Sequence, residues 1–172
     1  QTVTEVLRRS PVHPGDIFYI LAGTIHSLGA GITVAEVQQT SNCTYRLYDF
    51  GRLDANGKPR QLHVDKALDV VTLTPTCPVP PGRGRPLAQP EYTIERIADC
   101  DYFMVDMLDL KGRYLQEMDG GSFVAVLCLS GSVEVRWHGT GLALAKGESA
   151  FVPADSGEFG LEGAGRFLLT SL

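Results

Sequence analysis

The chain has 172 residues, of which 44% are hydrophobic and 20% are charged. This length fits one ordinary domain or two small ones, and the apolar fraction excludes a disordered tail. The formal net charge of −5 disfavours long-range attraction to nucleic acid or to an anionic membrane, so neither is an expected partner. No apolar run approaches the roughly 18 residues of a membrane span, and the opening residues lack the apolar centre of a signal peptide.

The four cysteines are widely spaced and form no Cys-x-x-Cys pair; they are Cys43, Cys77, Cys100 and Cys128. In a chain of this size such spacing is typical of free thiols in a reducing compartment, which predicts a cytoplasmic protein. The same spacing disfavours a zinc site built from cysteines. Cys128 lies within the apolar run FVAVLCL and is predicted to be a core residue.

The first half of the chain predicts short strands joined by turns, with little helix. The predicted strands are IFYILAG (17–23), GITVAEVQQ (31–39) and YRLYDF (45–50). The Asn-Gly pair in LDANGKP (53–59) predicts a turn. Apolar residues at helical spacing predict a short helix over 63–71, and residues 4–9 are compatible with the end of another.

A segment rich in proline, glycine and arginine, residues 77–90, separates the two halves. We interpret it as a linker or crossing segment, and a long surface loop within one domain remains the alternative. Beyond it, apolar runs recur at short intervals with turn residues between them, at 130–131, 139–141 and 146–148. The runs cover 91–97, 102–110, 122–130, 132–138, 149–154 and 166–172. Many short strands of this kind predict an antiparallel sandwich or barrel.

One motif in the first half points to chemistry: Gly15, five residues, Leu21, one residue, Gly23, two residues and His26. It resembles the second signature of the cupin jelly rolls, although Leu21 stands where that signature has proline. A glycine allows a tight corner there, and the corner can aim an imidazole at a divalent metal. Taken alone, a histidine in this setting is more often structural or solvated than a metal ligand.

A longer stretch, residues 11–71, resembles the C-terminal half of type I mannose-6-phosphate isomerases of the shorter bacterial kind. The resemblance rests on FYI-x-AGTIH (18–26), GI-x3-EVQQ-x-S (31–41), YRLYD (45–49) and LH-x2-KALDV (62–70). The second half of the chain is also compatible with that family's C-terminal β-domain. The resemblance implies zinc-dependent interconversion of mannose 6-phosphate and fructose 6-phosphate, in which a proton moves between C1 and C2 through an enediol-like intermediate.

The resemblance also implies roles for individual residues. His26 matches the last zinc ligand of the family, Glu36 an active-site carboxylate, and Arg46 an arginine that faces the substrate. Asn42 stands where an acidic residue is expected, and Arg52 stands where some members carry lysine, so both are candidates for substrate binding. A guanidinium can stabilise the developing negative charge, and a carboxylate can orient hydroxyl groups or move a proton. If residues 36–46 formed one regular strand, Glu36, Asn42 and Arg46 would share a face.

A purely structural interpretation of the same residues remains open beside the functional one. Without the resemblance, Arg46 and Glu36 would be surface or ion-paired strand residues. His63 and Lys66, on the predicted helix, are interpreted as structural or rim residues. The second half has Pro153-Ala-Asp-Ser-Gly where the cupin corner would carry histidine, which indicates a domain without metal.

The earlier cupin signature, His-x-His followed by a glutamate, does not occur in the chain. Zinc needs about three protein ligands, and only His26 is nominated here. Because the chain also begins at Gln1 rather than at methionine, we expect it to be the C-terminal part of an enzyme and inactive alone. The expected partners are a sugar phosphate and either the missing N-terminal half or a second copy of the chain.

The predicted fold is therefore all-β. Residues 1–86 should contribute the C-terminal part of a catalytic cupin jelly roll, incomplete in this chain, and 87–172 a smaller, degenerate cupin-like β-domain. The alternative functions are a non-catalytic sugar-phosphate-binding cupin and a structural cupin domain. Retained zinc would favour the enzyme, ligand binding without metal would favour the binding protein, and neither would favour the structural domain.

Overall fold

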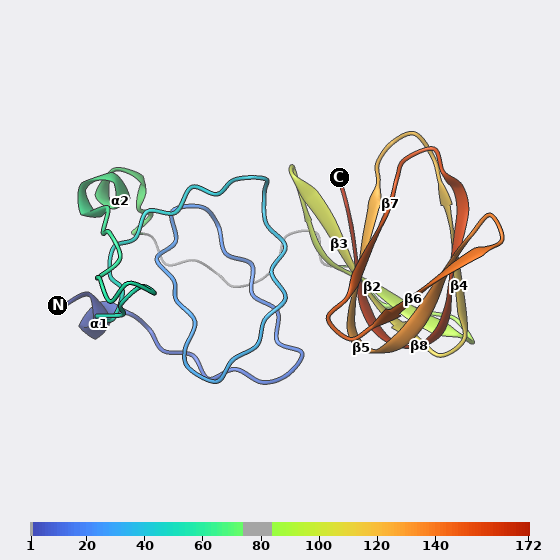
Figure 1. Cartoon of the computed structure of the whole chain (residues 1–172), viewed down its shortest axis with the longest axis horizontal. Helices are drawn as coiled ribbons and strands as arrows, with labels where there is room; N and C mark the ends of the chain where they lie inside the picture. Colours follow the sequence, from blue (N-terminus) through green and yellow to red (C-terminus); the bar gives the residue numbers. More distant parts are fainter. Residues whose placement is uncertain (1, 74–83) are drawn as a thin grey trace. The chain divides into compact units, whose positions relative to one another are not determined.

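The computed structural model describes residues 2–73 and 84–172 of the chain (Figure 1). The chain divides into two compact units by its internal contacts. The first unit comprises Gln1–Thr33 and Thr40–Val79, and the second comprises Val34–Gln39 and Pro80–Leu172. Part of the proposed linker, including Cys77, lies outside the described residues. The other three cysteines are free, and Cys128 is buried as predicted.

The second unit is an eight-stranded antiparallel sheet with the strand order β1-β2-β3-β8-β5-β6. Strand β4 pairs with β8, and β7 pairs with β5, off this main path. The strands are β1 (Leu87–Ala88), β2 (Tyr92–Cys100), β3 (Phe103–Leu110), β4 (Arg113–Met118), β5 (Val124–Trp137), β6 (Thr140–Ala145), β7 (Ser149–Val152) and β8 (Gly157–Ser171). The apolar runs predicted as strands beyond residue 90 all lie in strands, but 122–130 and 132–138 form one strand, and β4 and β6 were not predicted.

Two long strands, β5 and β8, pair with each other along most of their length and bend together near their middle. At the bend the backbones approach so closely that a Cβ on Gly131 would lie 2.1 Å from the carbonyl oxygen of Ala164. A Cβ on Gly165 would meet the carbonyl oxygen of Ser130 at 2.0 Å. Only glycine fits such an approach, so these positions let the sheet curl over its own inner face.

The predicted turn at 130–131 is wrong, because β5 continues through these residues with a shift in pairing register between Cys128 and Ser130. Buried positions in β5 are Val124, Val126 and Cys128 before the shift, and Val133 and Val135 after it. A bulge adds one residue to a strand, so it changes which alternate positions face inward. The bulge keeps both halves of the strand directed at one core.

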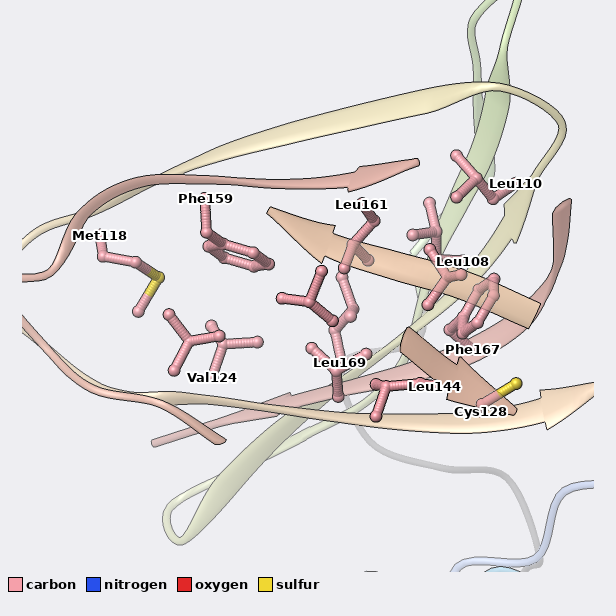
Figure 2. Packing of buried hydrophobic residues seen from close by; sticks show 14 residues of the cluster. Leu108, Leu110, Met118, Val124, Cys128, Leu144, Phe159, Leu161, Phe167 and Leu169 are labelled. Atoms are coloured by element: carbon pink, nitrogen blue, oxygen red, sulfur yellow. The ribbon is translucent and has the colours of Figure 1, made fainter. Parts of the chain in front are cut away.

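That core is a single cluster of buried side chains from six strands, β3 to β8, and β2 packs partly buried residues against it (Figure 2). Phe159, Leu161, Phe167 and Leu108 are fully buried in it. Because β5 and β8 supply residues from both sides of the bend, the curled sheet encloses one apolar interior. At the end of β5, His138 and Gly139 have φ values of +45° and +77°, as a two-residue type I′ hairpin turn requires.

The described part of the first unit contains two short helices, α1 (Val3–Val6) and α2 (Val64–Val70), and no strand. The helix predicted over 63–71 is confirmed, and a short helix also forms near the predicted residues 4–9. The turn at 53–59 is confirmed by an isolated bridge between Leu53 and Pro59. Neither helix, nor any other in the described residues, has the length and hydropathy needed to cross a membrane.

The strands predicted over 17–23, 31–39 and 45–50 are not formed in the described structure. A strand is stabilised by hydrogen bonds to a neighbouring strand, and these segments have no such ladder in this chain. Their apolar side chains stay exposed, among them Phe18, Ile20, Ile32 and Val34. The prediction of strands in these segments is therefore wrong for the described structure, whereas the predicted partner, a missing N-terminal half or a second copy of the chain, stays a prediction.

Candidate functional site

A tight turn at Leu21–Thr24 precedes His26 and positions the residues that follow it. The backbone N–H of Thr24 donates to the carbonyl of Leu21 at 3.1 Å, and Gly23 has a φ of +85°. The carbonyl of Gly23 accepts from the N–H of Thr72 at 2.9 Å, which attaches the turn to the chain after α2. A Cβ at Gly23 would lie 2.7 Å from the carbonyl oxygen of Val70, so this corner requires glycine.

The His26 side chain is exposed, and its Nδ1 donates to the carbonyl oxygen of Thr24 at 2.8 Å. A carbonyl oxygen can only accept, so Nδ1 carries the proton and the lone pair lies on Nε2. Metal-binding histidines are commonly oriented by such a backbone contact. His26 therefore fits the role of one imidazole ligand for zinc.

The rest of a metal site is not assembled by this chain: in residues 2–73 and 84–172, no three His, Cys, Asp or Glu side chains are grouped so as to hold a metal ion. Zinc in enzymes is usually held by three protein ligands. The described residues thus fit zinc as a source of one ligand, and they do not form a complete site.

Arg46 is held at its backbone and at its side chain by the segment that leads into α2. Its backbone N–H donates to Nδ1 of His63 at 3.2 Å, and its carbonyl accepts from the N–H of His63 at 2.8 Å. Its Nη1 donates to the carbonyl oxygen of Gln61 at 3.2 Å. His63, interpreted from sequence as structural, therefore fixes the residue that was predicted to face the substrate.

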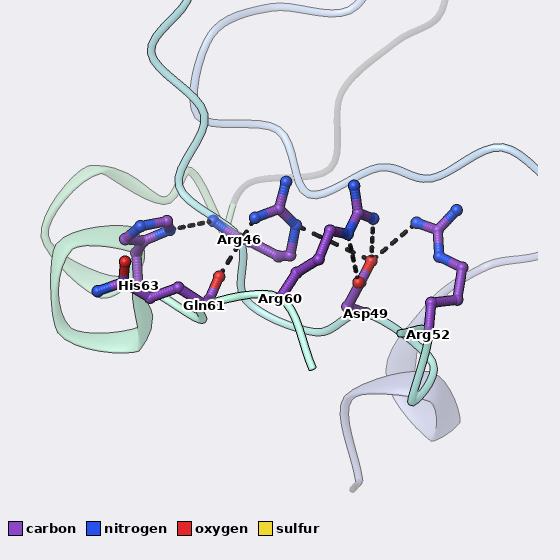
Figure 3. A network of polar contacts seen from close by, with 6 residues as sticks. All are labelled: Arg46, Asp49, Arg52, Arg60, Gln61 and His63. Atoms are coloured by element: carbon purple, nitrogen blue, oxygen red, sulfur yellow. Dashed lines mark hydrogen bonds and ion pairs between the residues drawn. The ribbon is translucent and has the colours of Figure 1, made fainter. Parts of the chain in front are cut away.

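Three arginines surround the carboxylate of Asp49 (Figure 3). Arg60 donates to both carboxylate oxygens, with its Nε 2.7 Å from Oδ2. Nη2 of Arg52 donates to Oδ1 at 2.8 Å, and Nε of Arg46 lies 3.9 Å from Oδ1. We call Arg46, Asp49, Arg52 and Arg60 the arginine cluster.

The arginine cluster carries three positive charges and one negative charge. Hydrogen bonds from Arg60 hold the pKa of the Asp49 carboxyl well below its ordinary value, against the effect of burial, and Arg52 acts in the same direction. The same contact raises the pKa of Arg60. The carboxylate is therefore ionised at neutral pH, and the cluster keeps an excess of positive charge that suits an anion.

The predicted site residues do not all gather in one place. Arg46 and Arg52 share the contact with Asp49, whereas no hydrogen bond or ion pair within the described chain joins His26 to either arginine. Asn42 is exposed in the first unit. Glu36 is also exposed, and it belongs to Val34–Gln39, which groups with the second unit. The expected strand face shared by Glu36, Asn42 and Arg46 is wrong, because residues 36–46 form no strand.

Asp49, Arg60 and Gln61 were not singled out from the sequence as site residues. The turn signal at Asn56-Gly57 was the available clue, because a chain that reverses there brings residues before 53 beside residues after 59. Asp54 stabilises this reversal by accepting from the backbone N–H groups of Asn56 and Lys58. The turn is thus what brings Arg60 to Asp49.

Comparison with known proteins identifies relatives of both units. Residues 93–172 match the sequence model of the family described as "Mannose-6-phosphate isomerase, cupin domain". The Mannose-6-phosphate isomerase ManA of Bacillus subtilis is 34% identical over 168 residues, which are 98% of this chain and 52% of that protein. A Mannose-6-phosphate isomerase of Streptococcus mutans is 47% identical over 68 residues, covering 40% of this chain and 22% of the relative.

The crystal structure of the mannose 6-phosphate isomerase from Bacillus subtilis superposes with a TM-score of 0.66 at 28% identity. The match covers 78% of this chain and 42% of that one. The resemblance and the all-β, cupin-like fold expected from the sequence are confirmed by these matches. The chain spans about half the length of the curated relatives that it matches over most of its own residues.

Proposed function

We propose that this chain, which belongs to the type I mannose-6-phosphate isomerase family and corresponds to its C-terminal cupin region, forms part of a zinc-dependent isomerase. The proposed reaction interconverts mannose 6-phosphate and fructose 6-phosphate. The observation that carries the proposal is the 34% identity to ManA over 98% of the chain. The arginine cluster supports it, because its excess positive charge suits a sugar phosphate.

In this proposal Arg46 acts on the charge that develops as a proton moves between C1 and C2. A guanidinium stabilises an enediolate oxygen without itself losing a proton. Arg52 and Asn42 contribute to substrate binding, Arg52 through its charge and Asn42 through hydrogen bonds. Glu36 orients the sugar hydroxyls or carries the transferred proton.

His26 is proposed as one zinc ligand, and its fixed tautomer, with the lone pair on Nε2, supports this role. Bound zinc would polarise the substrate oxygens. The remaining ligands are proposed to come from an N-terminal part of the enzyme outside this sequence, or from a second copy of the chain. The exposed apolar side chains of the first unit, such as Phe18 and Ile20, are compatible with such a partner. Three free cysteines fit the reducing cytoplasm proposed as its location.

The alternative is a sugar-phosphate-binding or structural cupin without catalysis. The observation in its favour is that the described residues assemble no group of three metal-ligand side chains. The two functions differ in what they require of zinc and of a partner, so they can be separated by experiment.

The test compares the 172-residue chain with a fusion in which the N-terminal part of ManA, outside the matched region, precedes it. Zinc is measured by elemental analysis, and isomerisation by an assay coupled to fructose 6-phosphate. We expect the chain alone to hold little zinc and to be inactive, and the fusion to gain zinc and turnover together. His26→Ala should remove both from the fusion, whereas His13→Ala, at an exposed histidine, should remove neither.

Each other outcome contradicts a defined part of the proposal. Stoichiometric zinc with full turnover from the 172-residue chain alone would refute its dependence on an N-terminal part. A fusion that binds fructose 6-phosphate without turning it over would favour the non-catalytic binding protein. A folded fusion with neither binding nor turnover would favour the structural role.

A further inference from the structure

Asp49 is the single buried charged or polar residue in the described part of the chain. Among the described residues of the first unit, only Ala67 is buried to a similar degree. Burial of a carboxylate is unfavourable unless its oxygens are paired, and a unit with so few buried residues gains little apolar stabilisation to offset it. The position of Asp49 therefore calls for an explanation beyond the ordinary surface ion pair.

The carboxylate brings three like charges together. Its oxygens accept from Arg60 and Arg52, and the guanidinium of Arg46 stands beside Oδ1. Like charges at such separations repel, so the array depends on the negative charge at its centre. Without Asp49, Arg52 and Arg60 would lose a hydrogen-bond acceptor, and all three arginines would lose their charge compensation.

The contacts of Arg46 leave one side of its guanidinium available. Nη1 is engaged with the carbonyl of Gln61, and Nε faces Asp49. Nη2 forms no hydrogen bond within the described residues, so its two N–H groups can donate to an oxygen of a bound molecule. Because the guanidinium is planar, contacts at Nε and at Nη1 together fix its orientation and so set the direction of the Nη2 N–H groups, which the ammonium group of lysine cannot reproduce.

We propose that Asp49 is a positioning residue that holds Arg46, with Arg52 and Arg60, in the arrangement that presents Nη2 of Arg46 to the substrate oxygen on which negative charge develops. This inference rests on the proposed isomerase function. Asp49 itself touches no substrate in this scheme and acts through the guanidinium of Arg46. Arg60 is its anchor, because it alone donates to both carboxylate oxygens.

A pair elsewhere in the chain provides the matched control. Arg166 donates to both oxygens of Asp109 at 2.7 and 2.9 Å, across β3 and β8. This pair has the same bidentate geometry, but its side chains are 45% and 42% exposed, against 7% for Asp49. Asp109→Asn removes an equivalent carboxylate far from Arg46 in the sequence and outside the first unit.

The first measurement records the Nε–Hε resonances of arginine by ¹⁵N NMR on the 172-residue chain. Asp49→Asn should accelerate hydrogen exchange at Nε of Arg60 about tenfold, because a charge-assisted hydrogen bond is lost. It should also shift the Nε resonance of Arg46 and leave the resonances of Arg96 and Arg166 in place. Asp109→Asn should alter Arg166 alone. An unchanged Arg46 resonance in folded Asp49→Asn would overturn the proposal.

The second measurement is steady-state kinetics on the fusion described above. Asp49→Asn should lower kcat about tenfold to a hundredfold while KM changes by less than about threefold, because the misplaced guanidinium matters most when charge develops. A kcat within twofold of wild type would overturn the proposal. So would a raised KM with kcat unchanged, which would identify a ground-state binding role.

A double variant covers the case in which Asp49→Asn fails to fold. Asp49→Asn combined with Arg60→Gln restores the net charge of the cluster while still removing the carboxylate. A positioning role predicts a folded protein whose kcat stays low, and a purely charge-balancing role predicts recovery of kcat to within twofold of wild type. If the wild-type fusion lacks isomerase activity, the proposed function fails, and the NMR measurement still decides whether Asp49 holds Arg46.

Discussion

Arg46 and His63 hold each other through a reciprocal pair of hydrogen bonds, although 17 positions separate them in the sequence. The backbone N–H of Arg46 donates to the imidazole Nδ1 of His63, and the backbone N–H of His63 donates to the carbonyl of Arg46. The imidazole must accept at Nδ1, so its proton lies on Nε2. His63 also stands at the N-cap of α2, which links the start of that helix to Arg46.

The contact predicts that asparagine replaces His63 better than alanine does. The side-chain oxygen of asparagine can accept from the N–H of Arg46, and alanine offers no acceptor. We expect His63→Ala to accelerate amide exchange at Arg46 about fivefold in the 172-residue chain, and His63→Asn to restore most of the protection. Equal exchange rates in wild type and His63→Ala would contradict the contact.

Lysine should not replace Arg46. Lys keeps the charge but cannot bind the carbonyl of Gln61 and face Asp49 while presenting further donors from the same plane. We expect Arg46→Lys in the fusion to lower kcat far more than it raises KM for fructose 6-phosphate. Arg9→Lys, at an exposed arginine of the same unit, should leave both constants unchanged. Wild-type kcat in Arg46→Lys would show that the arginine is structural.

Tyr114 should make the second unit sensitive to alkali. Burial, then the charge of Asp106 and the neighbouring Tyr92, raise its pKa to about 12. The folded state thus favours the neutral phenol, and this stabilisation is complete below the ordinary pKa of 10 and is lost as pH rises toward 12. Absorbance titration at 295 nm should show a tyrosine that titrates near pH 12.

Tyr114→Phe should remove the late titration step and make the decrease in the free energy of unfolding above pH 10 less steep. It also removes the hydrogen bond from the Tyr114 hydroxyl to Gln116, which should cost about 1 kcal/mol at neutral pH. Tyr102→Phe, at an exposed tyrosine, serves as the control. Persistence of the late step in Tyr114→Phe would assign it to another residue.

Two phenylalanines of the second unit differ sharply in burial and so provide a matched pair of truncations. Phe159 is fully buried, whereas Phe151 is 62% exposed and contacts only the ring of Phe123 among the aromatic residues described. Phe159→Ala should reduce the free energy of unfolding in urea by about 3–5 kcal/mol, because it leaves a cavity. Phe151→Ala should reduce it by about 1 kcal/mol. Equal losses would place Phe159 outside the cooperative core.

The sequence was most informative where a strand finds its partner within the chain. The strand character of 122–130 and 132–138 and the buried Cys128 follow local rules that the structure satisfies. The turn predicted at 139–141 lies instead at His138-Gly139, because Thr140 and Gly141 already belong to β6. The bulge at Cys128–Ser130 was predicted to be a turn, because a Ser-Gly pair is common both in turns and in bulges. What distinguishes them is the close approach of β8, which a sequence pattern does not contain.

The first unit shows the opposite case. Its apolar runs at 17–23 and 31–39 have strand character, but a strand needs hydrogen bonds to a neighbouring strand, and the described residues form no such pairing with these runs. The corner at Gly23 was predictable, because its requirement is local. The meeting of Asp49 with Arg60 was harder to foresee, because it depends on the register with which the chain reverses at Asn56-Gly57.

The bend shared by β5 and β8 has a consequence for how the second unit loses its structure. Both strands continue from one side of the bend to the other, so neither side can separate without breaking the ladder that holds its opposite. Opening should therefore be all-or-none across the unit, and slowly exchanging amides on the two sides of Gly131 should report the same opening free energy. Replacement of Gly131 by a residue with a side chain would therefore destabilise the sheet on both sides of the bend, although the new side chain would clash only at the bend.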